Sequence, residues 1–148
     1  MNSLILHKSI RRGSSNKKEQ HYFDFLVSGQ SLLKLLGVDS YDLITPVGTN
    51  MTTEFERNLV NEILLRKKSS LETGRIMLYV CPECADIDCG AITANIKDLG
   101  NKIVWKDFGY ENNYSEPDLT DYKEVGPFFF DKKQYFKTLE ELKTLTTK

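Results

Sequence analysis

Two alternating segments around a Gly-Asn turn constrain the fold of this chain more than any other feature. Residues 91–97 and 102–108 both alternate apolar and polar side chains, and the turn 98–101 joins them. A period of two indicates β-strands, and a short connection that contains Gly100 indicates a hairpin. The sequence therefore predicts an antiparallel β-hairpin near the middle of the fold.

The second strand of this hairpin carries the only tryptophan of the chain. Strict alternation places Ile103, Trp105 and Asp107 on one face, and Val104, Lys106 and Phe108 on the other. One aromatic face of a short sheet has to be covered. We therefore expect Trp105 to pack against the final helix or against a helix at 53–67.

The remaining periodicity predicts several strands and a few helices without regular β-α alternation. The run 75–80 is almost wholly apolar, which is typical of a central strand buried on both faces. Further strands are expected at 3–10, 21–27 and 127–130, and helices at 32–36, 53–67 and after Asp131. This element order predicts one α+β domain over residues 1–148, with two or three helices packed on an antiparallel sheet.

Capping residues mark the ends of the expected helices. Thr53 and Glu56 match a capping box, and Ser31 and Asp131 stand where an N-cap is expected. Gly37 is expected to stop the short helix. The final helix should bury its apolar stripe of Tyr135, Phe136, Leu139 and Leu142.

The overall composition excludes several classes of function. The 148 residues carry 20 basic and 21 acidic side chains, a formal net charge of −1, whereas a general nucleic-acid binder needs a basic surplus. No segment approaches the roughly 20 apolar residues of a membrane span, and the N-terminus has no secretory pattern. We therefore expect a soluble, cytoplasmic protein with reduced cysteines.

All three cysteines lie within nine residues, at Cys81, Cys84 and Cys89. A tetrahedral zinc site needs a fourth ligand, and Ala85 stands where a zinc knuckle prefers glycine. A redox C-x-x-C needs a following helix, but a strand is expected to begin soon afterwards. Semi-buried cysteines that shape a turn are the favoured interpretation, and structural zinc or redox chemistry are the alternatives. The candidates for a fourth ligand are His7, His21, Asp86 and Asp88.

The segment 107–124 is acidic and rich in tyrosine. It carries six carboxylates and one lysine in a chain that is nearly neutral overall, and residues 109–125 are predicted to be a loop. An exposed acidic loop with tyrosines is typical of a site for a basic protein partner. A solvated loop whose tyrosines cover the sheet edge is the alternative. The candidate binding residues are Tyr110, Glu111, Tyr114, Glu116, Asp118 and Asp121.

Three motifs carry a family resemblance. The chain reads V-C-P-E-C-A-D-I-D-C-G-A-I-T-A-N-I at 80–96, V-W-K-D-F-G-Y-E-N at 104–112 and G-P-F-F-F-D-K-K-Q-Y-F at 126–136. It resembles an uncharacterised family of small bacterial proteins with the pattern C-x-x-C-G-D-x-x-C-G-A, and the similarity extends to residues 21–32. Some members are labelled "oxidoreductase", but no nucleotide-binding fingerprint accompanies that label here. Ala85 departs from the family's glycine, and the resemblance implies kinship without an activity.

No G-x-S-x-G, H-E-x-x-H or P-loop pattern occurs in the chain. We therefore expect a non-enzymatic immunity protein that binds and neutralises a bacterial toxin, such as a basic nuclease toxin of contact-dependent growth inhibition. A carboxylate-rich face would mimic a phosphate backbone and speed association with such a partner. The alternative is a small metal- or redox-dependent enzyme, or a zinc-binding adaptor, that uses Cys81, Cys84 and Cys89.

Overall fold

The computed structural model describes residues 1–15, 19–48, 53–82 and 87–146. They form an α+β fold with two antiparallel sheets, which confirms the predicted class. One sheet contains β1 (Leu4–Arg11), β2 (Gln20–Val27) and β3 (Gln30–Ser31), and the other contains β4 (Ile76–Val80), β5 (Ala91–Asp98), β6 (Lys102–Glu111) and β7 (Phe128–Asp131). The helices are α1 (Leu32–Leu35), α2 (Thr53–Ile63) and α3 (Lys132–Thr146), with the short 3-10 turns η1 (Ile87–Cys89) and η2 (Thr120–Tyr122).

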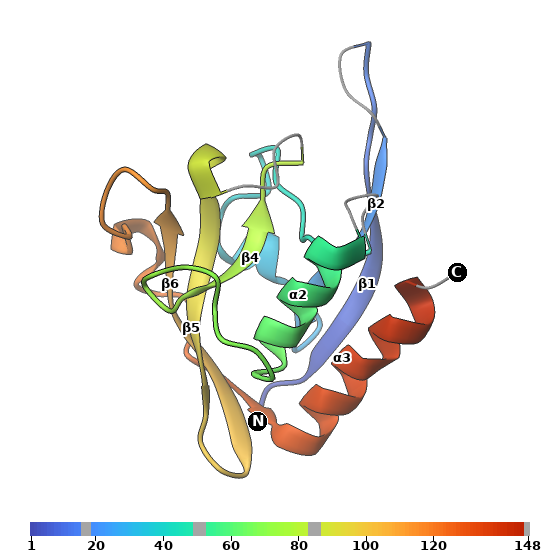
Figure 1. The fold of residues 1–148 in the computed structure, drawn as a ribbon, viewed down its shortest axis with the longest axis vertical. Coiled ribbons are helices and arrows are strands. Elements are labelled where there is room, and N and C mark those ends of the chain that lie inside the picture. The colour runs from blue at the N-terminus through green and yellow to red at the C-terminus, as the bar shows by residue number, and fades with distance from the viewer. Residues whose placement is uncertain (16–18, 49–52, 83–86, 147–148) are drawn as a thin grey trace.

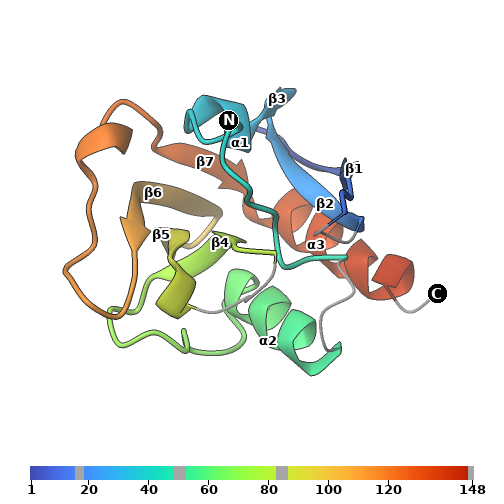
Figure 2. The ribbon, with the colours of Figure 1, turned by 90° about the horizontal axis from the view of Figure 1, so that it is seen from above.

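Backbone hydrogen bonds join the two sheets at two places. The Asn2 amide donates to the Phe129 carbonyl at 2.8 Å, which attaches the start of β1 to β7. The segment 44–47 makes the second link, because Ile44 pairs with Val80 and the Phe23 amide donates to the Val47 carbonyl at 2.9 Å. The two sheets therefore act as one scaffold. Figures 1 and 2 show α2 and α3 together on one side of the strands, with α1 on the opposite side.

The predicted hairpin is present as β5 and β6, but its second strand contains a bulge. Thr93 pairs with Gly109 and Asn95 pairs with Lys106, so Asp107 and Phe108 together face the single residue between them on β5. Asp107 has a φ of 55°, a left-handed conformation that also occurs in bulges of the G1 type. The extra residue shifts the alternation by one. The expectation that Phe108 faces away from Trp105 is therefore wrong, because both belong to one buried core.

Helix α2 ends earlier than predicted. Leu65 adopts a φ of 61°, its amide donates to the Glu62 carbonyl at 3.0 Å, and the Arg66 amide donates to the Asn61 carbonyl at 2.9 Å. These two bonds form a Schellman-type C-cap without glycine, so the helix does not continue to residue 67. Thr53 is the first residue of α2, and its side chain lies outside the described residues.

The other expected elements are present with two corrections. Strand β4 is buried on both faces, as predicted, but it lies at one edge of its sheet and not at the centre. Asp131 caps α3 by accepting from the Gln134 amide at 3.0 Å. Ser31 makes no cap and donates to Asp24 instead. The side chain of Leu142 lies outside the described residues.

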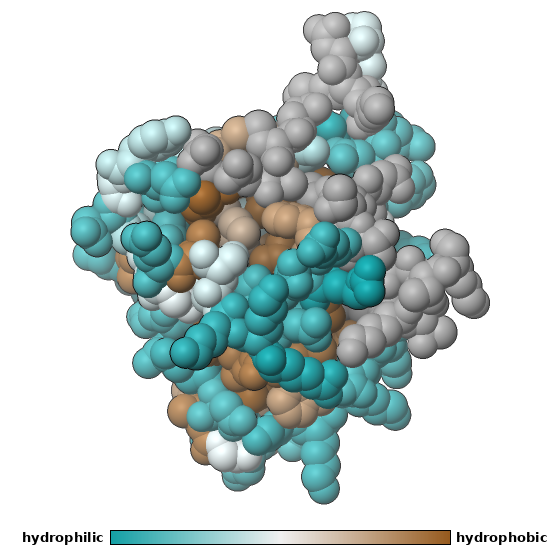
Figure 3. All heavy atoms as spheres, viewed as in Figure 1, coloured by the Kyte–Doolittle hydropathy of each residue, from teal (hydrophilic) through white to brown (hydrophobic). Residues whose placement is uncertain are grey.

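The core lies between the strands and the two long helices. Trp105 is fully buried, and its ring makes edge contacts with Phe25, Phe130 and Tyr135 at centroid distances of 5.3, 5.3 and 6.1 Å. The expectation that Trp105 packs against the final helix is confirmed, since Tyr135 belongs to α3. Figure 3 shows hydrophilic side chains over the outer side of α2 and hydrophobic ones in the seams around it. No helix among the described residues is long and apolar enough to cross a bilayer.

Candidate functional site

The acidic segment starts on a strand and not in a loop. Strand β6 continues to Glu111, so the prediction that residues 109–125 form a loop is wrong for its first three residues. The chain then turns back, and Tyr110 and Asp118 exchange backbone hydrogen bonds of 2.9 and 2.8 Å. Because this pair closes the loop 112–117 at its base, the loop is anchored to the sheet. It lies at the side of the molecule away from α3 (Figure 1).

Two candidate tyrosines are exposed at this site. Tyr110 is 43% exposed and Tyr114 is 78% exposed. Tyr110 lies over Gly90, where a Cβ atom would collide with the tyrosine hydroxyl. Tyr114 is held by Asn112, whose side-chain oxygen accepts from the Tyr114 and Ser115 amides at 2.9 and 3.1 Å. Local hydrogen bonds therefore hold the backbone that presents both rings.

Three of the candidate carboxylates are also exposed. Glu116 and Asp121 are exposed and make no hydrogen bond within the described chain. Asp118 accepts from the Thr120 amide at 3.0 Å, and this hydrogen bond lowers the pKa of its carboxyl group. Asp118 is therefore both a surface charge and an acceptor for the first amide of η2, whereas Glu116 and Asp121 contribute charge alone.

Tyr122 is a buried residue next to this surface. Burial raises its pKa, and the nearby charges or hydroxyls of four exposed residues add to the effect: Asp121, Tyr41, Asp118 and Tyr110. Tyr41 is 63% exposed and was not among the candidates. Its sequence signal was weak, a tyrosine in a polar turn between Asp39 and Asp42. The exposed side chains of Tyr41, Tyr110, Tyr114, Glu116, Asp118 and Asp121 are called the acidic tyrosine face below.

Glu111 does not belong to this face. Its side chain is only 4% exposed and lies 3.4 Å from the buried guanidinium of Arg75. Thr93 and Thr73 donate to its two carboxylate oxygens at 2.9 and 2.8 Å. Arg75 also donates to the Thr93 carbonyl at 3.0 Å and to the Asp107 carbonyl. The prediction that Glu111 is a surface contact is therefore wrong. Glu111 is the buried partner of Arg75 in an ion pair beneath the face.

The cysteine cluster is described only in part. Cys81 is a half-buried free thiol, and Cys84 lies outside the described residues. Cys89 is disulfide-bonded, so the expectation of reduced cysteines is wrong for this residue. Of the candidate fourth ligands, His7 and His21 lie on β1 and β2, Asp86 is outside the described residues, and the Asp88 side chain is not described. In the described part of the chain, no three histidine, cysteine or acidic side chains gather as metal ligands. A zinc site would need the Cys89 disulfide to be reduced first.

Comparison with known proteins finds no relative of this chain. No protein-family model matches the chain, and neither a curated protein nor a solved structure matches it. The assignment of the acidic tyrosine face therefore depends on its own chemistry. That chemistry consists of three exposed phenols and three exposed carboxylates.

Proposed function

We propose that this chain is a non-enzymatic binding protein, an immunity protein that neutralises a bacterial toxin in the cytoplasm. The observation that carries the proposal is the acidic tyrosine face on a hydrogen-bonded scaffold. Tyr110, Tyr114 and Tyr41 are each more than 40% exposed, although aromatic side chains of this size usually bury most of their surface. Tyrosine is enriched in protein interfaces, and charged side chains are typical of the interface rim.

The charge of the face indicates the sign of the partner. The segment 107–124 contains six carboxylates and one lysine, and only Glu111 among them is buried against a counter-charge. The rest of the chain is therefore slightly basic, since its total is −1. A concentrated negative field attracts a basic surface over about one Debye length and raises the association rate. A nuclease toxin, which needs a basic surface to bind nucleic acid, fits this requirement.

The rigidity of the face would favour tight binding. Asn112 holds the Tyr114 turn, and the Tyr110–Asp118 backbone pair closes the loop. Tyrosine has few rotatable bonds, so immobilising it on binding costs little conformational entropy. A partner that covers Tyr110 and Tyr114 would therefore gain contact area without having to order the loop first.

Affinity capture from native cell extract tests the proposal with two matched charge reversals. The wild-type chain should retain a basic protein that the Glu116→Lys/Asp121→Lys variant does not retain. Glu54→Lys/Glu141→Lys makes the same change in net charge at exposed positions on α2 and α3, and it should retain the partner. The gene of the captured protein should be toxic when expressed alone and tolerated when this chain is co-expressed. Retention by the face variant, or a partner without toxicity, contradicts the proposal.

A further inference from the structure

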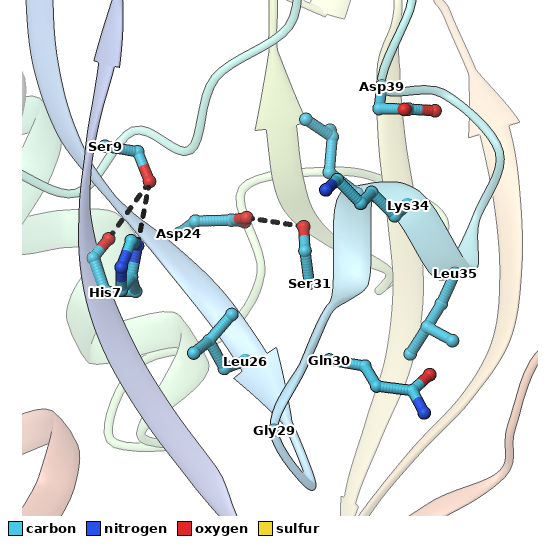
Figure 4. A pocket seen from close by; sticks show the side chains of 11 residues that line it. His7, Ser9, Asp24, Leu26, Gly29, Gln30, Ser31, Lys34, Leu35 and Asp39 are labelled. Atoms are coloured by element: carbon cyan, nitrogen blue, oxygen red, sulfur yellow. Dashed lines mark hydrogen bonds between the residues drawn. The ribbon is translucent and has the colours of Figure 1, made fainter.

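A cavity of about 700 Å³ lies between β1 and β2 on one side and the β3–α1 segment on the other (Figure 4). None of the six side chains that define the acidic tyrosine face lines it. Its volume is within the range of small-molecule sites, roughly 300–1,000 Å³. The polar side chains that line it include Asp24, Ser31, Lys34 and His7. These residues come from three strands and one helix, so the chain is folded around the space.

One wall of the cavity contains a buried carboxylate without a counter-charge. Asp24 is 5% exposed, and its oxygens accept from the Phe25 amide at 2.8 Å, the Tyr79 hydroxyl at 2.5 Å and the Ser31 hydroxyl at 2.7 Å. All three donors are neutral. In the described part of the chain, no cationic side chain lies within 4 Å of Asp24. A buried carboxylate of this kind attracts a ligand cation that can reach it.

The facing wall supplies the opposite charge. Lys34 is exposed, and Figure 4 shows its amine turned toward the Asp24–Ser31 pair. No carboxylate of the described residues lies within 4 Å of that amine. His7 places its Nδ1 3.4 Å from the Ser9 hydroxyl, and its Nε2 has no partner among the described residues. The Lys34 ammonium thus faces the Asp24 carboxylate across a gap too wide for a direct ion pair, whereas His7 lies beside Asp24 as its register partner on the neighbouring strand.

The remaining wall is apolar. Leu26, Leu33 and Leu35 line the cavity between the two charged sides. Asp39 adds a second carboxylate at the edge. The cavity therefore offers a negative side, a positive side and an aliphatic surface, which are the three features that recognise an amino acid with an aliphatic side chain.

We propose that this cavity binds a small zwitterion of the aliphatic α-amino acid class. The ligand ammonium would lie against Asp24 and Ser31, and its carboxylate would accept from Lys34 on the facing wall. Charge-assisted hydrogen bonds at both ends would fix its orientation, and the side chain would cover the leucines. This site is independent of the proposed toxin-binding function.

Titration of the labelled wild-type chain by NMR, with L-leucine as the probe, tests the site. Leucine should shift the amide signals of residues 24–35. The matched probes are 4-methylpentanoate, which lacks the ammonium, and 3-methylbutylamine, which lacks the carboxylate. Each should bind about tenfold more weakly or worse, because each leaves one charged wall without a partner. The analogues test the Asp24 side of the cavity without a substitution of Asp24, which would also remove the hydrogen bond from Tyr79.

The protein side is tested with Lys34→Met, which keeps the length of an exposed side chain and removes its charge. This variant should weaken leucine binding about tenfold, and Lys137→Met on α3 should leave it unchanged. Absence of leucine-dependent shifts up to its solubility limit overturns the proposal. Equal binding of leucine and 4-methylpentanoate overturns the ammonium contact, and undiminished binding by Lys34→Met overturns the carboxylate contact, so either result removes the zwitterion assignment.

Discussion

The indole N–H of Trp105 donates to the phenolic oxygen of Tyr135 at 3.0 Å, and the Tyr135 hydroxyl in turn donates to the Ile63 carbonyl at 2.7 Å. This chain of two hydrogen bonds links β6, α3 and the C-terminal end of α2 inside the core. Both side chains are fully buried. The Ile63 carbonyl is among the last of α2, where a helix leaves its carbonyls without helical partners. Tyr135 therefore joins the two helices to the sheet and satisfies a helix end.

We predict that truncation at this point destabilises the fold strongly. Trp105→Ala should lower the free energy of unfolding by about 3–5 kcal/mol, because it removes the central ring of an aromatic cluster. Tyr135→Phe should cost about 1–3 kcal/mol, since it leaves the Trp105 N–H and the Ile63 carbonyl unpaired. Urea unfolding followed by circular dichroism measures both. Tyr114→Phe is the exposed control, and an equal cost for Tyr114→Phe and Tyr135→Phe would contradict this account.

Buried tyrosines predict a loss of stability at high pH. Burial raises the pKa of both Tyr79 and Tyr135 above the ordinary 10.0, so the folded state keeps protons that the unfolded chain loses. Their stabilisation is fully present below pH 10 and is lost progressively as the pH rises above 10. In that window, each group lowers the free energy of unfolding by up to about 1.4 kcal/mol for every pH unit.

Unfolding midpoints at increasing pH above 9 test this sign and slope. Tyr135→Phe should start from lower stability and then lose it less steeply than the wild type does. Tyr114→Phe should keep the wild-type slope, because Tyr114 is exposed. Parallel curves for the wild type and Tyr135→Phe would exclude a protonated Tyr135 in the folded state as the cause.

The ion pair beneath the acidic tyrosine face predicts a stability effect where the sequence suggested a binding effect. Glu111→Gln should destabilise the chain by about 3 kcal/mol, since it leaves the buried Arg75 guanidinium without its nearest counter-charge. Glu116→Gln, at an exposed position, should change stability by less than about 0.5 kcal/mol. Thermal unfolding compares the two.

A double replacement separates the ion pair from simple packing. Arg75→Met/Glu111→Leu removes both charges, so it should be less destabilising than the sum of the two single changes. Additive costs would show that Arg75 and Glu111 do not depend on each other. If Glu116→Gln lowers the free energy of unfolding as much as Glu111→Gln does, the wrong carboxylate has been assigned to the core.

The hairpin and the aromatic core could be predicted from the sequence because their signals are local. Alternation around Gly100 defines β5 and β6, and the cap at Asp131 defines the start of α3. The bulge at Asp107 had no such signal. Aspartate tolerates a positive φ better than most residues but does not require it, so nothing in the segment marks the shift in register.

The composition of the candidate site was predictable only for residues without distant partners. Tyr114 and Glu116 are exposed, as a polar turn suggests. Glu111 is buried because Arg75 and Thr73 lie beside it, although they are more than 35 residues away in the sequence. Tyr41 is likewise distant in the sequence from Tyr122, whose pKa it helps to raise. Periodicity cannot place such residues, because pairing between distant segments decides their burial.

The cysteines predict a specific pattern of chemical reactivity. In the non-reduced protein, Cys81 should react with an alkylating reagent under native or denaturing conditions, whereas Cys89 should react only after reduction. Peptide mapping by mass spectrometry distinguishes the two sites. Elemental analysis of the same sample should find well under one zinc per chain. Stoichiometric zinc, together with a Cys89 that becomes reactive when a chelator is added, would show that Cys89 is a metal ligand and not part of a disulfide.

Binding kinetics with the captured partner at two salt concentrations test the central claim most directly. Glu116→Lys/Asp121→Lys should mainly slow association, and the wild-type association rate should fall as salt rises. Tyr110→Ala and Tyr114→Ala should instead speed dissociation, by about 2 kcal/mol or more if either is a hot spot. Glu54→Lys/Glu141→Lys should match the wild type in both rates. Association that is independent of salt, together with face variants that bind as tightly as the wild type, would contradict the account.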